Sequence, residues 1–551
     1  MFRKQLAQLI KQQTPLDEKT ITELIEIPPD PQLGDYAFPC FRLAKQLKKS
    51  PQQIAEELAG SIQADWIQEV QANGPYINFF IQEDIYAQTI LENKPIHENK
   101  EETIMVEFSQ PNTHKQFHIG HLRNAALGEA LSRTLTNAGY NVIRATYPGD
   151  HGAHVAKSLW YLQNYTQEIP KENKGVFLGK IYVEATKKLE EHPELKEEVS
   201  KVHQALDAEE ENITKLWQET RKWSLEEFKE VYKELAVNFD VWYFESEEDK
   251  EANRIVDELL EKNIAKKSQG AIIVDLEEKG LGIAVVRKSD GTTLYLTKDL
   301  SLGQKKFQEH NLDRSIYLID SRQKLHMQQA FAILQQMGFE KEMYHLPYEM
   351  VTLPEGAMSS RKGTVVLYED FKKRVKKKLV EETRNKRSEW SKEQVEEVAQ
   401  KLLIGSLMYG MLKVDNNTEI QFNEEEWTSL EGETGPYIQY TYARIQSILR
   451  KHTQTTNPDY AQLNTKEDKE ILRVLANEKE TQTEAANNYK PHIIAKYCLQ
   501  LAKKTNEYYH KHNVLKEEEN LREARTQLLR KIAETLERNT QLIAIPLVEE
   551  M

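Results

Sequence analysis

The sequence predicts an α/β protein. A Rossmann-type domain with a parallel sheet is expected between an N-terminal α+β domain and an all-α C-terminal helical bundle. Two patterns predict this fold class. Short apolar runs alternate with helical patterns over residues 99–369, as in a doubly wound sheet, whereas residues 370–551 read as almost entirely helical. At about 100–200 residues per domain, a chain of 551 residues has room for three or four domains.

Residues 1–98 make up the first predicted domain, and apolar residues at helical spacing predict a helix at its start. Residues 33–59 read as a turn followed by two helices, the second beginning at the cap signal Ser50-Pro51. The run GPYINFFI, residues 74–81, is rich in β-branched and aromatic residues and predicts a strand.

The central domain, residues 99–369, opens with the order strand, helix, strand, helix. The four runs are TIMVEFS, GHLRNAALGEALSRTLTNAGY, NVIRATY and GAHVAKSLWYLQNY. Residues from about 166 to 250 are charged and helix-rich, and we interpret them as an insertion between the two halves of the sheet. Apolar runs then continue the α/β pattern at residues 271–277, 282–288, 292–297, 314–320 and 348–353. The third predicted domain, residues 370–551, is helical.

Composition narrows the function classes. The net charge of −14 would repel a polyanion at long range, which weighs against indiscriminate nucleic-acid binding but allows a local basic face. The densest candidate for such a face is Phe371–Arg387, which is equally well read as a solvated helix surface. The two cysteines, Cys40 and Cys498, form no CxxC motif, so we expect neither a disulfide framework nor a cysteine zinc site, and a cytoplasmic protein. We expect no membrane segment and no signal peptide.

His118 and His121 lie three residues apart where the first helix of the central domain is predicted to begin. Free backbone N–H groups and the positive end of the helix dipole lie at the same place, and Gly120 lets a phosphate approach the backbone. Because this HxGH pattern follows the first strand of a parallel sheet, it predicts a nucleotide-phosphate site. The alternative interpretation is that the two histidines merely form hydrogen bonds on an ordinary helix and bind no ligand.

A second stretch, GAMSSRKGTVVLYED at residues 356–370, follows the last predicted strand. This stretch is predicted to form a small loop that is rich in hydroxyl side chains and carries Arg361 and Lys362. Such a loop can close over phosphates and neutralise the charge on a leaving group. An ordinary surface turn is the alternative. The combination of both stretches favours the nucleotide site.

These motifs lead to a family. The sequence resembles class I aminoacyl-tRNA synthetases, and specifically the arginyl-tRNA synthetases, over essentially its whole length. The match is carried by VEFSQPNTHKQFHIGHLRNAALG, SDGTTLYLTKDL, RQKLHMQQAFAILQQMG, MSSRKGTVV and EGETGPYIQYTYARIQSILRK, and by GPYINF in the N-terminal domain. The resemblance implies that ATP and L-arginine give arginyl-adenylate and pyrophosphate, after which arginine passes to the terminal adenosine of tRNA(Arg). It further implies Mg²⁺ with ATP, tRNA as a requirement for the first step, a monomer, and no tightly bound metal or cofactor.

The resemblance also assigns roles to residues. For arginine, it implies Glu107 and Asp299 as partners of the guanidinium, Tyr295 as a wall, and Ser109, Asn112 and Gln323 for the α-amino and α-carboxylate groups. For ATP, it implies His118, Gly120, His121, His326, Met358, Ser359 and Ser360. The alternative for each carboxylate is a surface ion pair or a helix cap, and for the tyrosine it is core packing.

Two departures from the family pattern matter. The signature loop of other class I enzymes reads Lys-Met-Ser-Lys-Ser, but here it runs from Ala357 to Arg361 and lacks both lysines. We hypothesise that Lys115 supplies the missing charge, assisted by Arg361 or Lys362. Asp320 and the serine after it stand where the family usually has a glycine, which puts the ribose contacts in doubt.

Aromatic residues predict the tRNA contacts. Tyr437, Tyr440 and Arg444 fall at helical spacing and can stack unpaired bases, and the resemblance assigns this region to the anticodon. It assigns Tyr76 and Asn78 to the outer corner of the tRNA. Packing between helices, or within a buried strand, would produce the same patterns.

Two other functions stay open. The chain can be another class I synthetase, or an HxGH nucleotidyltransferase fused to helices. It can also be an inactive synthetase relative that serves as a binding module, although the retained histidines argue against this. Pyrophosphate exchange with each amino acid, with and without tRNA, separates the three.

Overall fold

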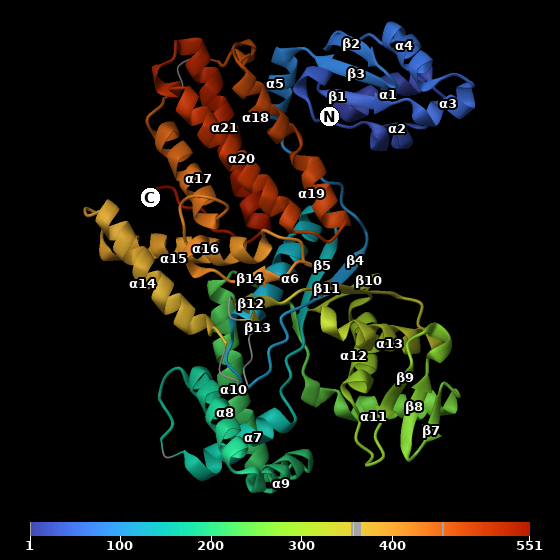
Figure 1. Cartoon of the computed structure of the whole chain (residues 1–551), viewed down its shortest axis with the longest axis vertical. Helices are drawn as coiled ribbons and strands as arrows, with labels where there is room; N and C mark the ends of the chain where they lie inside the picture. The colour runs from blue at the N-terminus through green and yellow to red at the C-terminus, as the bar shows by residue number, and fades with distance from the viewer. Residues whose placement is uncertain (1, 167, 354–355, 358–364, 454–456) are drawn as a thin grey trace. The chain divides into compact units, whose positions relative to one another are not determined.

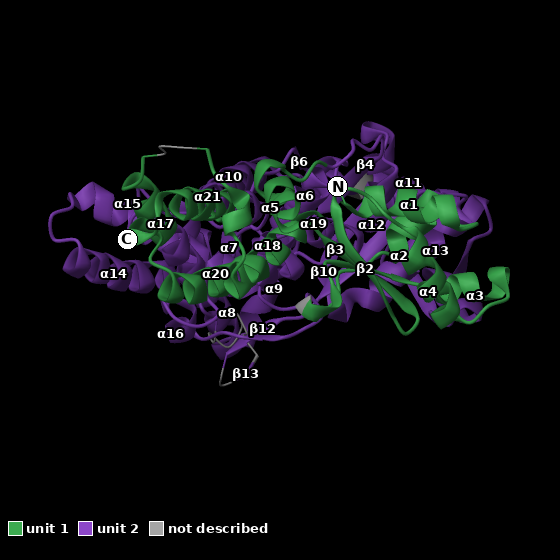
Figure 2. Ribbon diagram, turned by 90° about the horizontal axis from the view of Figure 1, so that it is seen from above, with its two compact units in different colours: residues 1–96, 444–479, 500–536 green, residues 97–443, 480–499, 537–551 purple. Residues whose placement is uncertain are grey.

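A computed structural model describes residues 2–166, 168–353, 356–357, 365–453 and 457–551 (Figure 1). The chain divides into two compact units, which Figure 2 colours separately. Unit 1 comprises residues 1–96, 444–479 and 500–536, and unit 2 comprises residues 97–443, 480–499 and 537–551. This division follows spatial contacts, so the domain limits expected after residues 98 and 369 stay predictions.

Unit 1 contains an antiparallel sheet in the order β1-β3-β2, formed by β1 (Tyr36–Pro39), β2 (Ile67–Asn73) and β3 (Tyr76–Ile81). Its complete helices are α1 (Phe2–Gln13), α2 (Glu18–Leu24), α3 (Phe41–Leu47), α4 (Pro51–Ser61), α5 (Glu83–Glu92) and α18 (Lys466–Ala476). The predicted strand at residues 74–81 is β3, and the predicted helix start at Ser50 is confirmed. The Ser50 side chain accepts from the Gln53 N–H as part of a capping box.

Residues far apart in the sequence meet in unit 1. Arg473 of α18 donates to the Gly34 carbonyl (3.1 Å), and its guanidinium lies 3.4 Å from the Asp35 carboxylate. Lys469 pairs with Glu83 of α5 at 2.5 Å. The first predicted domain therefore shares a unit with part of the helical third.

Unit 2 is built on a five-stranded parallel sheet in the order β11-β10-β4-β5-β6. The strands are β4 (Thr103–Glu107), β5 (Asn141–Thr146), β6 (Val241–Trp242), β10 (Arg314–Asp320) and β11 (Glu342–Tyr348). The first half of the sheet runs outward from β4 to β6, and the second half starts again beside β4 at β10. The order therefore reverses between β4 and β10, and the carboxyl ends there are the expected ligand position of an open parallel sheet.

Helices lie on both faces of this sheet, with α12 (Tyr295–His310) against Met105 on one face and α6 (Ile119–Asn137) against Phe108 on the other. Besides these two, the helices wholly within unit 2 are α7 (Ala153–Tyr165), α8 (Lys174–Glu191), α9 (Lys196–Asp207), α10 (Glu211–Glu234), α11 (Asp249–Glu261), α13 (Lys324–Gln336), α14 (Tyr368–Lys386), α15 (Lys392–Leu412) and α16 (Glu424–Trp427). Four helices contribute residues to both units, namely α17 (Gly435–Arg450), α19 (Glu478–Asn487), α20 (His492–Lys511) and α21 (Glu519–Leu542).

Side chains alternate along β4, and this alternation separates the two faces. Met105 packs with Leu302 and Phe307 of α12 on one face. Phe108, just after the strand, turns to the other face and meets Gly128 of α6, where an added Cβ would lie 2.0 Å from the ring. Gly128 therefore allows α6 to lie close against the strand.

The predicted insertion, residues 166–250, contains α8, α9 and α10, the short 3₁₀ helices η2 (Pro193–Leu195) and η3 (Glu245–Glu247), and the start of α11. Its last part also contributes β6 to the parallel sheet, which the charged pattern did not reveal. Since β6 has only two residues, its apolar signal is too short to stand out.

Of the five apolar runs expected to continue the α/β pattern, residues 314–320 form a strand of the parallel sheet, and the other four do not. Residues 271–277 and 282–288 contribute not to the parallel sheet but to an antiparallel one, β7-β8-β9, formed by β7 (Ala265–Ser268), β8 (Ala271–Asp275) and β9 (Ile283–Arg287). The reason is the two-residue turn at Gln269-Gly270, whose φ values of 47° and 82° fit a tight hairpin.

Residues 292–297 do not form a strand, because α12 begins at Tyr295 and its buried residues recur at helical spacing. Residues 348–353 end in β12 (Val351–Leu353), which belongs to a small separate sheet with β13 (Gly356–Ala357) and β14 (Ile420–Gln421). The last parallel strand is thus β11. Among the described residues, no helix has both the length and the apolar composition needed to cross a bilayer.

Candidate functional site

The two histidines begin α6 at the carboxyl end of β4. His118 is the N-cap, and its Nδ1 accepts from the His121 N–H at 3.3 Å while its own N–H donates to His121 Nδ1 at 3.4 Å. The two rings are stacked, with centroids 3.7 Å apart and planes 17° apart. The HxGH spacing therefore forms a reciprocal cap in which both imidazoles lie at the positive end of a nineteen-residue helix.

Both imidazoles are held neutral. Burial, reinforced by the charge of Lys115, lowers the pKa of His118 to about 4. Burial, followed by the charges of His118 and Lys115, lowers the pKa of His121 well below its usual value. Both residues nevertheless keep partial exposure to solvent. At neutral pH the pair therefore offers uncharged hydrogen-bonding groups beside a cation.

Lys115 lies near enough to act on three imidazoles, because its charge also lowers the pKa of His154 after the larger effect of burial. The Lys115 ammonium is 5.2 Å from the ring centroid of Tyr182 on α8. Sequence reasoning singled out Lys115 as the substitute cation, and the structure places its charge beside the histidine pair.

The segment after the predicted phosphate loop runs beside the start of α6. The Ile119 N–H donates to the Val366 carbonyl at 3.1 Å, and the Tyr368 N–H donates to the Phe117 carbonyl at 3.1 Å. His118 and Leu367 form an antiparallel bridge. The loop residues predicted to contact ATP, Met358, Ser359, Ser360, Arg361 and Lys362, lie outside the described residues.

Glu107, the last residue of β4, is buried and forms an ion pair with Lys306 of α12. Burial lowers the pKa of the Lys306 ammonium well below its usual value. Glu107, Lys306 and Asp299 line one cavity of about 20 Å³. That volume suffices for a single water molecule, which needs about 10–15 Å³, and not for a guanidinium group with its side chain.

Asp299, also on α12, pairs with His326 of α13 through Oδ2 and Nε2 at 2.5 Å. Each side chain keeps close to 30% of its surface exposed (29% and 28%). The hydrogen bond with Asp299 raises the pKa of His326 above its usual value. Each of the two carboxylates predicted to hold a guanidinium therefore already has a basic partner, Lys306 on α12 or His326 on α13.

The residues predicted to orient the arginine backbone differ in exposure. Ser109 is buried at a φ of 53°, and its hydroxyl lies 2.9 Å from that of Tyr232 on α10. Asn112 is half-buried, and its amide oxygen lies 2.3 Å from where a Cβ on Gly149 would be, so a larger residue at position 149 would displace this amide. Gln323 is exposed. Tyr295, predicted as a wall, has 65% of its surface exposed.

Asp320 ends β10 and is engaged with its neighbour. Its carboxylate accepts two bonds from the Arg322 guanidinium, each of 2.8 Å, and one from the Arg322 N–H at 2.9 Å. Asp320, which stands with Ser321 where the family pattern has a glycine, is thus held by Arg322.

The residues predicted to bind tRNA lie on β3 and α17. Asn78 is buried, with 4% exposure, while the half-buried Tyr76 ring packs edge-on against the exposed Phe41. On α17, Tyr437 is half-buried and Tyr440 is exposed. Arg444 donates to Asn506 of α20 at 3.1 Å, and its guanidinium lies 3.9 Å from the Tyr509 ring centroid.

Sequence reasoning missed residues that shape the site. Lys306 is one of them. It lies seven residues after Asp299 and so shares a face of α12 with Asp299, and this spacing could have revealed it. His114 is another. It is fully buried at a φ of 62°, and its Nε2 lies 2.9 Å from the Thr220 hydroxyl of α10. It ties the strand-to-helix connection to the insertion.

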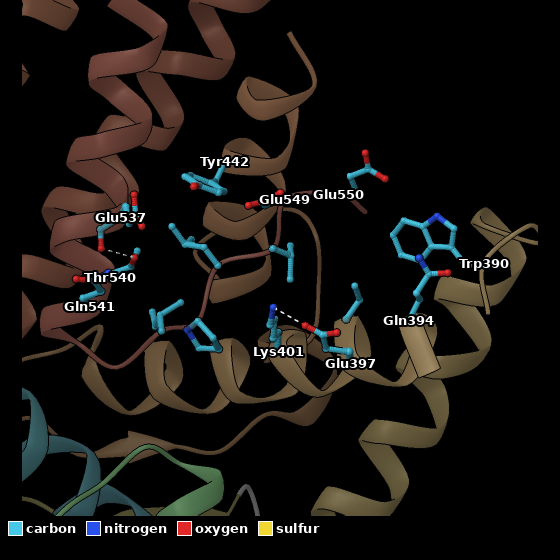
Figure 3. A pocket seen from close by; sticks show the side chains of 15 residues that line it. Trp390, Gln394, Glu397, Lys401, Tyr442, Glu537, Thr540, Gln541, Glu549 and Glu550 are labelled. Carbon is cyan, nitrogen blue, oxygen red and sulfur yellow. Dashed lines mark hydrogen bonds and ion pairs between the residues drawn. The ribbon is translucent and has the colours of Figure 1, made fainter. Parts of the chain in front are cut away.

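A larger cavity of unit 2, about 650 Å³, lies elsewhere in the helical part (Figure 3). It is formed by α15, α17, the end of α21 and the C-terminal residues, and contains Trp390, Tyr442 and the Lys401–Glu397 ion pair (2.8 Å). None of the predicted site residues lines it.

Comparisons with known proteins agree with this architecture. A family model described as the catalytic domain of class I tRNA synthetases (R) matches residues 84–424. An arginyl-tRNA synthetase N-terminal domain matches residues 1–81, and a DALR anticodon-binding domain matches residues 438–551. Together with the parallel sheet and the HxGH helix start, these matches define a class I aminoacyl-tRNA synthetase.

Full-length relatives specify the family. The chain is 39% identical to an arginine–tRNA ligase of Bdellovibrio bacteriovorus, covering 97% of this chain and 95% of that protein. It is 35% identical to one of Clostridium perfringens, covering 100% of both chains. The solved arginyl-tRNA synthetase of Thermus thermophilus superposes with a TM-score of 0.84 at 27% identity, covering 100% of both chains. The chain belongs to the arginyl-tRNA synthetase family.

Proposed function

We propose that the chain catalyses the ATP-dependent ligation of L-arginine to tRNA(Arg). A carboxylate oxygen of arginine attacks the α-phosphorus of ATP, so that an O–P bond forms as the bond to pyrophosphate breaks. A ribose hydroxyl of the 3′-terminal adenosine then attacks the carbonyl carbon of arginyl-adenylate, and AMP leaves. One observation carries the proposal: a neutral imidazole pair caps a helix at the switch point of the sheet, in a chain related over its full length to arginine–tRNA ligases.

For ATP, we assign the phosphates to His118, Gly120 and His121. The N-terminal N–H groups of α6 and the imidazoles would stabilise charge that develops on the α-phosphoryl group, and one such preorganised donor is worth about 2.7–4 kcal/mol. Lys115 adds a positive charge beside them. The predicted loop residues Met358, Ser359, Ser360, Arg361 and Lys362 would complete the site. Mg²⁺ would enter with ATP as part of the substrate and reduce the charge of the phosphates.

For arginine, we assign the guanidinium to Glu107 and Asp299. Lys306 and His326 already contact these carboxylates, so a guanidinium would compete with an existing basic partner for each. Because the cavity between them is small, the binding step needs side chains to move. Tyr295, Ser109, Asn112 and Gln323 are the further predicted contacts, and His326 lines the same region.

For tRNA, we assign the anticodon to the region of Tyr437, Tyr440 and Arg444, and the outer corner to Tyr76 and Asn78. The exposed ring of Tyr440 and the Phe41–Tyr76 pair offer surfaces for stacking, which contributes about 1–3 kcal/mol per base. We further propose that the enzyme acts as a cytoplasmic monomer.

Pyrophosphate exchange tests the activity. The full chain is incubated with ATP, labelled pyrophosphate and each amino acid in turn, with and without total tRNA. Exchange with arginine alone, and only after tRNA is added, is the expected result. Exchange with another amino acid would assign a different synthetase, and no exchange with any amino acid would mean an inactive relative.

A further inference from the structure

Two histidines and an aspartate outside the described site converge on one point. His203 and Asp207 lie one turn apart on α9, and His151 lies in the connection between β5 and α7. Their nearest ligand atoms all lie within 4.8 Å of one another. Neither the expected reaction nor the sequence motifs use these three residues.

The distances fit a metal better than direct bonds. Asp207 Oδ1 lies 3.6 Å from His151 Nε2 and 3.8 Å from His203 Nε2, both longer than a hydrogen bond of about 2.7–3.2 Å. Ligands at about 2.0–2.2 Å from a tetrahedral zinc ion are separated by about 3.3–3.6 Å. Small side-chain shifts therefore suffice to bring all three atoms onto one ion.

His151 is held in place by its neighbours. The carboxylate of Asp150, which is fully buried, accepts from Ser246 (2.9 Å and 2.8 Å) and pairs with Arg221 of α10 at 2.6 Å. Trp217 donates to the Asp150 carbonyl at 2.8 Å, and its ring stands edge-on to the His151 imidazole. A ligand fixed in this way loses little conformational entropy when it binds an ion.

The donor set indicates the class of ion. Imidazole nitrogens favour zinc and its transition-metal neighbours, whereas Mg²⁺ and Ca²⁺ prefer sites made of oxygen ligands alone. Exposure of the side chains increases from His151 (16%) through His203 (36%) to Asp207 (54%), so water can supply a fourth ligand from the solvent side.

We propose that His151, His203 and Asp207 form a binding site for a transition-metal ion of the Zn²⁺ type, which links α9 to the connection between β5 and α7. The same connection contains Gly149, whose carbonyl accepts from the Thr113 N–H at 2.9 Å, directly after the predicted arginine contact Asn112. The ion would thus fasten the insertion to a segment that lies against the candidate site.

Zinc binding to the full chain, first freed of metal with a chelator, tests the proposal. A chromophoric chelator competes for Zn²⁺, and we expect one equivalent to bind and to raise the melting temperature. His203→Ala and Asp207→Asn are each expected to weaken binding at least about tenfold and to abolish the rise in melting temperature. Co²⁺ in place of Zn²⁺ should give the visible absorption of a four-coordinate site in the unmodified chain and lose it in His203→Ala.

His192→Ala is the matched control, because His192 lies in the same insertion and its imidazole lies 3.3 Å from the exposed carboxylate of Glu194, outside the proposed site. It should bind Zn²⁺ like the unmodified chain. Equal affinity in His203→Ala and His192→Ala would overturn the proposal, as would the absence of saturable binding in the unmodified chain. Since these readouts do not involve arginine or ATP, they are independent of the proposed function.

Discussion

At the scale of single residues, charge near the histidine pair decides what the pair can do. Neutral imidazoles can donate or accept hydrogen bonds but cannot offset the charge of a phosphate, and both signature-loop lysines are missing. The described cation whose charge acts on both His118 and His121 is Lys115. Substituting Lys115 removes this positive charge and leaves the His118–His121 helix cap in place, so it separates the effect of the charge on catalysis from the effect of the cap.

Lys115→Ala should slow arginyl-adenylate formation by about 10²–10³-fold while changing arginine affinity little, because the lost charge acts on the phosphate and not on the guanidinium. Single-turnover pyrophosphate release and arginine titration measure the two effects. Lys157→Ala is the control, since Lys157 also lies over the Tyr182 ring (4.1 Å) but does not shift the pKa of either histidine of the pair. A near-normal rate for Lys115→Ala would rule out its role.

The Asp299–His326 pair predicts that arginine affinity depends on pH. The hydrogen bond with Asp299 raises the pKa of His326 above its usual value of about 6.5. The ion pair therefore stabilises the folded chain at low pH, and this stabilisation is lost as the pH rises through the raised pKa. Above that pKa the imidazole no longer competes for Asp299. Between about pH 6 and about pH 8, arginine should therefore bind more tightly as pH rises, by at most about tenfold per unit.

Calorimetric titration without ATP measures this dependence. His326→Asn removes the titrating group and should flatten the profile while leaving the fold intact. A profile of equal steepness in both proteins would assign the pH dependence to another group.

The spacing of residues in the sequence predicted which of them share a helix face. It could not predict which residues are buried or which residues from distant parts of the chain contact one another. The His118–His121 pair follows from three-residue spacing at a helix start. The partner of Glu107 lies far away along the chain, on α12, and only the fold brings the two together. The metal site was missed for the same reason, because His151 is far from His203 in sequence.

At the scale of elements, α6 depends on a close approach to β4. Alanine is favoured over glycine by about 1 kcal/mol inside a helix, yet a Cβ at Gly128 would overlap the Phe108 ring. Gly128→Ala should therefore destabilise the chain by about 1–3 kcal/mol. Gly60→Ala in α4, where an added Cβ would meet nothing within 4 Å, should leave stability unchanged or raise it slightly.

Thermal unfolding followed by circular dichroism compares the two variants. Opposite signs are expected, and a second substitution, Phe108→Leu, should recover part of the loss in Gly128→Ala. Equal melting temperatures for both glycine variants would show that α6 can move away from the strand without cost.

Elements with a continuous apolar run or a helical pattern were predictable, whereas elements with an ambiguous local pattern were not. The sequence predicts β4 because it is an apolar run bounded by polar residues, and α6 because its helix-forming pattern continues over several turns. It misses β1, at residues 36–39, because four residues that end in proline resemble a turn. Residues 292–297 read as a strand because they are apolar and β-branched, yet the helical pattern that starts at Tyr295 prevails.

At the scale of the whole molecule, the net charge of −14 opposes the binding of a polyanion, so tRNA needs local basic surfaces. In α14 the buried residues Phe371, Val375 and Leu379 recur on one face. Lys373 and Lys377 lie on the exposed side, whereas Arg374 pairs with Glu424 at 2.7 Å. The basic run is thus a solvated helix face with carboxylate contacts, and it still presents lysines that a phosphate can reach.

We expect Lys373 and Lys377 to contact tRNA phosphates. Affinity should fall as salt rises from about 50 mM to about 200 mM, with a slope of about −0.7 to −0.9 in log–log form for each neutralised phosphate. Replacing both lysines with alanine should make the slope shallower by about 1.4–1.8. The matched control replaces Lys262 and Lys266, which already pair with Glu258 (2.8 Å) and Asp275 (2.9 Å), and changes net charge equally. Filter binding at several salt concentrations measures each slope, and identical slopes for the two double variants would mean that only total charge matters and that α14 does not touch the nucleic acid.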